Sequence, residues 1–200
     1  MDIRNGVTTS FWDNKTKFLH MGLALVVSLQ LFNSLVMQVP KPGRVSSGFG
    51  GAMFEFHEWA GMTALVIVLA HWMWSIWGVR GSGIRHLFPF TIADRLKMRQ
   101  ELRDLQKFNL PPSGPAGRLP GLIHGLGLLA VTAIALTGAV LFFGMPEGGG
   151  KLPPFADFSK ETHEVLSTFV WIYWGGHGAL ALLHGLVARD GSLYRMFKLS

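Results

Sequence analysis

The chain contains four long runs that carry almost no charge, at residues 18–37, 57–77, 122–145 and 165–187. Each run has about the 20 residues that an α-helix needs to cross the hydrocarbon core of a bilayer. Lipid offers an exposed backbone no hydrogen-bond partner, so runs of this kind must fold as helices. The pattern therefore predicts an all-α integral membrane protein, built as a single four-helix bundle over residues 1–200.

The composition supports this class of protein and excludes several others. Hydrophobic residues make up 49% of the chain and charged residues only 15%. The formal net charge of +6 does not indicate nucleic-acid binding, because the basic residues lie between the apolar runs, where they set membrane orientation. The chain has no cysteine, which excludes disulfides, iron–sulfur clusters held by this chain and covalent c-type haem attachment.

The distribution of Lys and Arg predicts the orientation of the bundle. From the N-terminus, the five segments outside the runs hold 3, 2, 8, 2 and 3 of the 18 basic residues. Cytoplasmic segments carry the excess of Lys and Arg in multi-pass proteins. We therefore expect both termini and the long connection at residues 78–120 to lie in the cytoplasm.

The long connection contains a segment with helical periodicity, TIADRLKMRQELRDLQKF, at residues 91–108. Apolar residues recur among its charges, at Ile92, Leu96, Leu102, Leu105 and Phe108. A basic amphipathic helix of this kind can lie at the membrane interface on an anionic leaflet. A solvated helix that packs on the bundle or on a partner protein explains the same pattern equally well.

Three histidines mark the last apolar segment, taken here from about Glu161 to Val187, as functional. His163 and His177 are 14 residues apart, which on an α-helix separates them by about 21 Å with a difference in direction of about 40°. They therefore face the same partners at two depths, and His184 follows on the same face two turns later. Ionisable side chains in membrane helices are costly and usually mark a function.

The expected topology gives these histidines partners on other helices. His57 enters its run from the same side as His163, and His20, His71 and His124 fall near the depth of His177. Bis-histidine ligation of haem needs imidazoles from two facing helices, so the chain can hold two non-covalent haems. His57 and His71 are also 14 residues apart, so either His71 or His20 could pair with His177.

Other interpretations of the histidines are weaker or less specific. Zinc or copper is disfavoured, because residues about 21 Å apart cannot share one ion and no cysteine or carboxylate cluster accompanies them. A haem-free transporter with a histidine relay remains an alternative. Glycines near the candidate ligands could contact a porphyrin or allow close helix packing; they are Gly22, Gly61, Gly175, Gly176 and Gly178.

Several segments together resemble one known family. They are FLHMGLAL at 18–25, HEWAGMTALVIVLAHWMW at 57–74, HGLGLLAVTAIALTGAVLFF at 124–143, the pair HE at 163–164 with a second histidine 14 residues on, and RDGSLYRMF at 189–197. This pattern resembles the bacterial cytochrome b561 family, which is related to the cytochrome b subunits of nickel–iron hydrogenases and formate dehydrogenase. The resemblance covers all four runs.

The resemblance implies a set of iron ligands. It pairs His57 with His163 on an outer haem b and His20 with His177 on an inner haem b, so that it favours His20 over His71. His71 stands where stand-alone members are expected to have an arginine or an apolar residue. The long basic connection is more similar to the hydrogenase-type cytochromes, which work with a partner subunit.

The resemblance also implies an activity. It predicts electron transfer between the quinone pool and a redox partner, such as a cytochrome c, a hydrogenase or another dehydrogenase subunit, in a respiratory oxidoreductase of the bacterial inner membrane. A stand-alone quinone-linked superoxide oxidase is the alternative within the family. Quinol oxidation needs a group that accepts a proton; His184 is our first candidate for this quinone site, followed by His71 and His124.

Overall fold

The structure is a computed structural model that describes most of the chain. The described residues are 12–41, 47–77, 83–107, 109–110, 117–146, 150–188 and 191–197. They form helices and contain no β-strand, so the predicted all-α fold is confirmed for this part of the chain. The other segments, which include parts of the predicted connections, lie outside the described residues.

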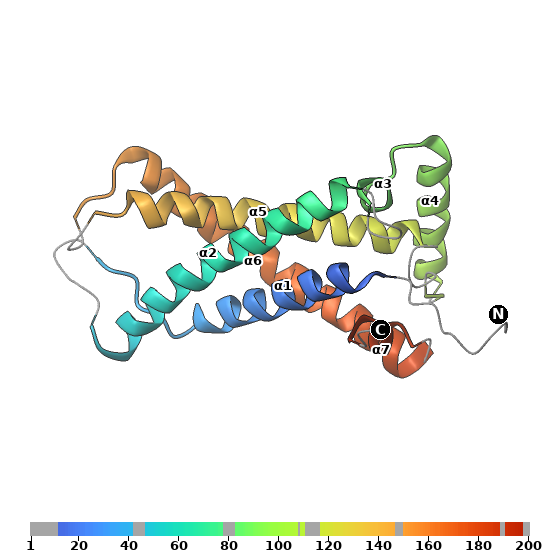
Figure 1. Ribbon diagram of the computed structural model, residues 1–200, viewed down its shortest axis with the longest axis horizontal. Coiled ribbons are helices and arrows are strands. Elements are labelled where there is room, and N and C mark those ends of the chain that lie inside the picture. The colour runs from blue at the N-terminus through green and yellow to red at the C-terminus, as the bar shows by residue number, and fades with distance from the viewer. Residues whose placement is uncertain are drawn as a thin grey trace. The chain divides into compact units, whose positions relative to one another are not determined.

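The helices follow the chain in the order drawn in Figure 1. The long helices are α1 at Asn14–Asn33, α2 at Gly48–Ile76, α5 at Arg118–Gly144 and α6 at Pro154–Leu182. Between α2 and α5 lie the short helix α3 at Ile84–Leu87 and the helix α4 at Ile92–Gln106. A π-helical turn, η2 at Leu183–Ala188, continues α6, and α7 follows at Ser192–Phe197.

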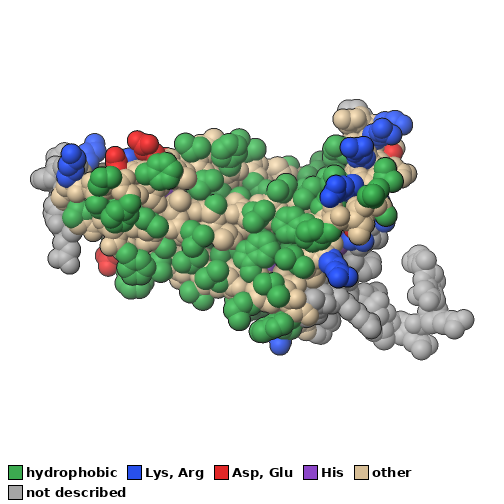
Figure 2. All heavy atoms as spheres, turned by 90° about the horizontal axis from the view of Figure 1, so that it is seen from above, with side chains coloured by type: hydrophobic (Ala, Val, Ile, Leu, Met, Phe, Trp, Pro, Cys, Tyr) green, Lys and Arg blue, Asp and Glu red, His purple; other side chains and the backbone are tan. Residues whose placement is uncertain are grey.

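Three of these helices are long and apolar enough to cross a membrane. They are α2, α5 and the continuous helix at Pro154–Val187, which joins α6 to η2. Their outer surfaces expose large apolar side chains, such as Phe143 at 77% and Ile172 at 68%. Figure 2 shows hydrophobic side chains over much of the visible face. The protein is therefore a membrane protein.

The helix α1 is not among these three, and its bounds differ from the predicted run at 18–37. It begins at Asn14 because the Asp13 carboxylate accepts a hydrogen bond of 3.0 Å from the Thr16 backbone, as an N-cap residue does. It ends at Asn33, and turns follow. The first turn of α1 is polar, which an apolar run does not reveal.

Two other helices begin well before the runs that predicted them. The helix α2 starts at Gly48 rather than at residue 57, and α6 starts at Pro154 rather than at residue 165. Proline suits the first position of a helix, because its missing N–H has no partner there in any helix. The added turns of α6 carry charged residues and those of α2 contain three glycines, so hydrophobicity alone could not locate them.

The chain divides into two compact units, which we describe separately. The α4 unit comprises Met1–Phe18, Trp74–Gly125 and Ala179–Ser200. The histidine-pair unit comprises Leu19–Met73 and Leu126–Gly178. The second unit is named for the two pairs of histidines that it contains.

Polar and aromatic side chains connect the helices within the histidine-pair unit. The Gln30 amide donates a 2.8 Å hydrogen bond to the His57 carbonyl and so ties α1 to α2. Trp72 donates to Thr132 at 2.9 Å, between α2 and α5, and Trp174 donates to Ser28 at 2.9 Å, between α6 and α1. Each donor is a side chain that would be costly to bury without a partner.

The α4 unit joins the connection to the start of α5. Thr91 and Asp94 form a capping box that begins α4, so the helix predicted from residues 91–108 is present. The buried Glu101 carboxylate accepts hydrogen bonds from the backbone N–H groups of Arg118 and Leu119, at 2.9 and 2.7 Å. An ion pair of 2.8 Å between Arg118 and Asp94 adds a second link.

Candidate functional site

The first histidine pair joins α2 to α6. The ring centres of His57 and His163 are 6.2 Å apart, and their planes meet at 77°. The Nδ1 atom of His57 is buried and has no hydrogen-bond partner in the described part of the chain. A buried polar atom without a partner costs free energy, which favours a ligand here that the chain itself does not supply.

Thr137 of α5 fixes the orientation of His163. Its Oγ1 atom lies 3.0 Å from His163 Nδ1, and the same hydroxyl donates to the Ile134 carbonyl at 2.9 Å. Because the hydroxyl proton is used on that carbonyl, the hydroxyl accepts from Nδ1–H. His163 therefore keeps its other ring nitrogen, Nε2, unprotonated and able to bind a metal.

Two further contacts hold this arrangement. Ser159, one turn before His163 on α6, donates a 3.0 Å hydrogen bond to the Thr137 carbonyl. Gly138 brings α5 close to the imidazole, because a Cβ atom at this position would lie 3.2 Å from His163 Cε1. A side chain larger than hydrogen at residue 138 would press on the ring.

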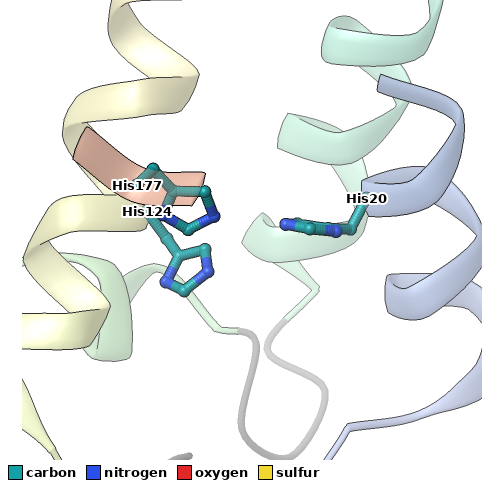
Figure 3. A group of neighbouring side chains, drawn as sticks. All are labelled: His20, His124 and His177. Atoms are coloured by element: carbon teal, nitrogen blue, oxygen red, sulfur yellow. The ribbon is translucent and has the colours of Figure 1, made fainter. Parts of the chain in front are cut away.

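The second pair joins α1 to α6 and is drawn in Figure 3. The ring centres of His20 and His177 are 6.1 Å apart, with an angle of 57° between the planes. A nitrogen of each ring lies within 4.8 Å of a nitrogen of the other. His124, which Figure 3 also draws, belongs to the α4 unit and is described with that unit below.

Tyr173 stacks on His177 from the preceding turn of α6. The two ring centres are 5.4 Å apart and the planes are inclined by only 9°. Gly127 of α5 makes room for the tyrosine, because a Cβ atom there would overlap the phenol oxygen and the carbon that bears it. Gly127 and Tyr173 therefore position His177 together.

The spacing within both pairs fits bis-histidine ligation of one metal. Two metal–nitrogen bonds in line, each of about 2 Å, plus the ring radius at each end, separate the ring centres by about 6 Å. The ring centres of the two pairs lie 6.2 and 6.1 Å apart. The hydrogen bond from His163 Nδ1 to Thr137 is also the kind of contact that orients a metal-binding histidine.

The glycines around His177 do not contact a neighbouring helix. A Cβ atom at Gly175, Gly176 or Gly178 would meet no atom within 4 Å, and Gly175 and Gly176 are exposed. Glycine is therefore not needed at these positions to let another helix approach closely.

The three candidates for the quinone site lie at separate places. His71 is buried on α2 in the histidine-pair unit, with 7% of its surface exposed. His124 lies on α5 in the α4 unit, where its Nδ1 donates a 2.7 Å hydrogen bond to the Pro120 carbonyl. His184 is half-buried in the π-helical turn η2 of the same unit.

The site also contains residues that the sequence did not single out. Thr137, Tyr173 and Gly127 are isolated residues within apolar runs, and no periodic signal distinguishes them from packing residues. Carboxylates also lie near His57 and His163 in sequence. Glu55 and Glu161 are exposed, and Glu164 forms an ion pair of 2.9 Å with Lys160.

Membrane helices that carry facing histidines are typical of the helical membrane cytochromes, a class of protein that holds haem between imidazoles. The family model of prokaryotic cytochrome b561 matches residues 12–199. The chain therefore belongs to this family of membrane electron-transfer proteins, which bind haem b. Searches of curated proteins and of solved structures found no match.

Proposed function

We propose that the protein is a dihaem cytochrome b that transfers electrons between the quinone pool and a redox partner protein. His57 and His163 would hold one haem b, and His20 and His177 the other. The observation that carries this proposal is the presence of two imidazole pairs with ring centres 6.1 and 6.2 Å apart. A histidine relay for protons would not need two pairs matched to this distance.

The residues around the pairs would prepare the imidazoles for this role. Haem b, when bound, supplies a one-electron couple at its iron. Thr137 would keep the Nδ1 proton of His163 in place, so that Nε2 is left to bind iron. Tyr173 limits rotation of the His177 ring by stacking on it. Ligands held in this way change little in position when an electron arrives or leaves.

We further propose four membrane crossings, with both termini and the segment that contains α4 in the cytoplasm of a bacterium. In addition to the three apolar helices, α1 would cross as the first span. Support comes from the contacts of α1 inside the histidine-pair unit: Gln30 bonds to α2 and Ser28 accepts from Trp174 of α6. The basic residues of the segment between α2 and α5 support the orientation.

A quinone site would need a residue that accepts the proton released on quinol oxidation. His184 is our first candidate, because it lies in a π-helical turn, a feature that often accompanies functional sites. His71 and His124 are the other candidates. His124 could exchange a proton only at Nε2, since its Nδ1–H is used on the Pro120 carbonyl.

The acidic surroundings of the outer pair favour an electron-transfer subunit over a superoxide oxidase. Glu55 and Glu161 are exposed in the same unit as His57 and His163, whereas the charge of Glu164 is paired with Lys160. Superoxide is an anion, and negative charges around a site slow the approach of anions. A protein partner with a basic surface would be attracted to the same region.

The proposal is tested by the haem content of the purified protein. A reduced-minus-oxidised visible spectrum with pyridine haemochrome quantification should give two low-spin haems b per chain. One haem per chain would contradict the dihaem assignment. A colourless protein would contradict the proposal altogether and favour the histidine-relay transporter.

The partner class requires a second measurement on the loaded protein. Reduction of the haems by a quinol, followed by transfer of electrons to added cytochrome c, is expected if the protein serves a soluble partner. Quinone reduction that depends on superoxide and needs no other protein would instead identify a superoxide oxidase.

A further inference from the structure

The helix α4 presents a basic outer surface. Its exposed charged side chains are all cationic; they are Arg95, Lys97, Arg99 and Arg103, followed by Lys107 at the C-cap. The three acidic residues of the helix are less exposed, and Asp104 is half-buried. Glu101 is only 5% exposed, and Asp94 pairs with Arg118. Figure 2 shows Lys and Arg gathered at the end where Figure 1 draws α4.

The contacts of Glu101 establish which way this surface faces. The first N–H groups of a helix point back along its axis, beyond the start of the helix. Glu101 accepts from two of these groups, on Arg118 and Leu119. The helix α4 therefore crosses the end of α5, and the side of α4 opposite Glu101 faces away from it. Since α5 is long enough to cross a membrane, that side faces water.

Apolar residues lie among the cations on this side. With 100° per residue, the side opposite Glu101 holds Ile92, Leu96, Arg99 and Arg103, which we call the α4 outer face. Ile92 is 77% exposed and Leu96 is 60% exposed. A helix that lies on lipid directs such residues into the bilayer. Here they face away from it, and apolar residues mixed with arginine are typical of protein interfaces.

We propose that the α4 outer face is a docking surface for a soluble protein with an acidic surface. Charge complementarity supports this partner, because the α4 outer face carries two arginines and none of the acidic residues of the helix. The two apolar side chains would form the buried centre of the contact, and the arginines would surround them. The inference does not depend on haem binding, since the face contains none of the histidines.

The first test asks whether the face lies in water or in lipid. The chain has no cysteine, so Leu96→Cys in the full-length protein can carry a single nitroxide label. In a bilayer, a water-soluble nickel chelate should relax this label more strongly than oxygen does. Lys151→Cys serves as the reference for a label in water, and Leu136→Cys on α5 as the reference for a label in lipid. Relaxation like that at Leu136 would place the face in lipid and overturn the proposal.

The second test measures binding of an acidic probe. Flavodoxin, a soluble acidic protein, would be titrated against the haem-loaded protein in nanodiscs of zwitterionic lipid. Binding should weaken as salt increases, and Arg99→Glu with Arg103→Glu should weaken it by about tenfold or more at low ionic strength. The matched control is Lys41→Glu with Lys151→Glu, two exposed lysines outside α4.

The outcomes of the second test are distinct. Loss of binding in the arginine variant alone supports docking at α4. No binding at low ionic strength, or an equal loss in both variants, would overturn the proposal.

Discussion

In the proposed haem site, Thr137 would determine which nitrogen of His163 binds iron. Thr137→Val keeps the shape of the side chain but removes the oxygen that accepts from Nδ1–H, so the imidazole loses its fixed orientation. We expect the affinity of this pair for haem to fall about 10-fold to 100-fold and the reduction potential of that haem to change. Haem titration of the apoprotein and a redox titration would measure both effects.

The conservative variant separates orientation from packing. Thr137→Ser retains the hydroxyl and should restore most of the affinity and the potential. If the Thr137→Val and Thr137→Ser variants have the same haem affinity and the same reduction potential, the hydrogen bond of 3.0 Å to His163 does not orient a ligand. Thr137 then contributes to packing only.

The choice between His20 and His71 gives a second prediction at single residues. His163→Ala should leave one haem per chain, because it removes one imidazole of the pair formed with His57. His71→Ala should leave two, because the ring beside His177 belongs to His20. Pyridine haemochrome assays on both variants give the counts, and loss of a haem from the His71 variant would contradict the assignment.

At the scale of elements, one carboxylate connects α4 to α5. Glu101 accepts from two backbone N–H groups at the start of α5, where a negative charge also interacts favourably with the helix dipole. Glu101→Gln removes that charge and one of the accepting oxygens, and should cost about 1–2 kcal/mol of unfolding free energy. Thermal unfolding in detergent, followed by circular dichroism, would detect the loss.

A surface position on the same helix provides the control. Gln106 is exposed near the end of α4, so Gln106→Ala should change the unfolding midpoint little. Equal midpoints for the Glu101 and Gln106 variants would show that the cap on α5 does not contribute to stability.

The helix α3 should make part of the stability depend on pH. Burial lowers the pKa of His86 below 6.5, and the neighbouring His124 and Arg118 lower it further. A histidine with a lowered pKa contributes its full stability above pH 6.5 and loses it as pH falls towards the folded-state value. His86→Gln cannot titrate, so its unfolding midpoint should fall less between pH 7 and pH 5 than that of the wild type. Equal falls would show that His86 is not responsible.

For the whole molecule, the apolar runs predicted the class of protein but not the helix ends. A run of hydrophobic residues does not mark the ends of a helix: α2 and α6 begin nine and eleven residues before the predicted starts at 57 and 165, in glycine-rich and in charged sequence respectively. Helix α1 likewise begins before its predicted start at residue 18, because Asp13 caps its first turn. Helix α4 was predictable because its charges and apolar residues alternate with helical period.

The candidate site was predictable to a different extent. The spacing of His163 and His177 indicated two depths on one helix, and the family resemblance indicated which histidines stand opposite. The supporting residues could not be predicted, because Thr137, Tyr173 and Gly127 gain their roles only from contacts between α5 and α6. Such contacts join residues far apart in sequence and leave no local pattern.

The number of membrane crossings is open to a direct test on the whole molecule. If α1 crosses the membrane, Asn14 and Ser47, at its two sides, face opposite compartments. Single cysteines can be placed at these exposed positions and at Gln100 and Lys151, because the chain has none of its own. A maleimide that cannot cross membranes would then label each protein in spheroplasts or in inverted vesicles.

If the chain crosses four times and its termini are cytoplasmic, the maleimide should label Ser47→Cys and Lys151→Cys in spheroplasts. It should label Asn14→Cys and Gln100→Cys in inverted vesicles. With only the three apolar helices crossing, Asn14→Cys would be labelled from the same side as Ser47→Cys. That result would place α1 against the bundle without spanning the bilayer. His20 would then reach His177 from a helix whose two ends lie on the same side of the membrane.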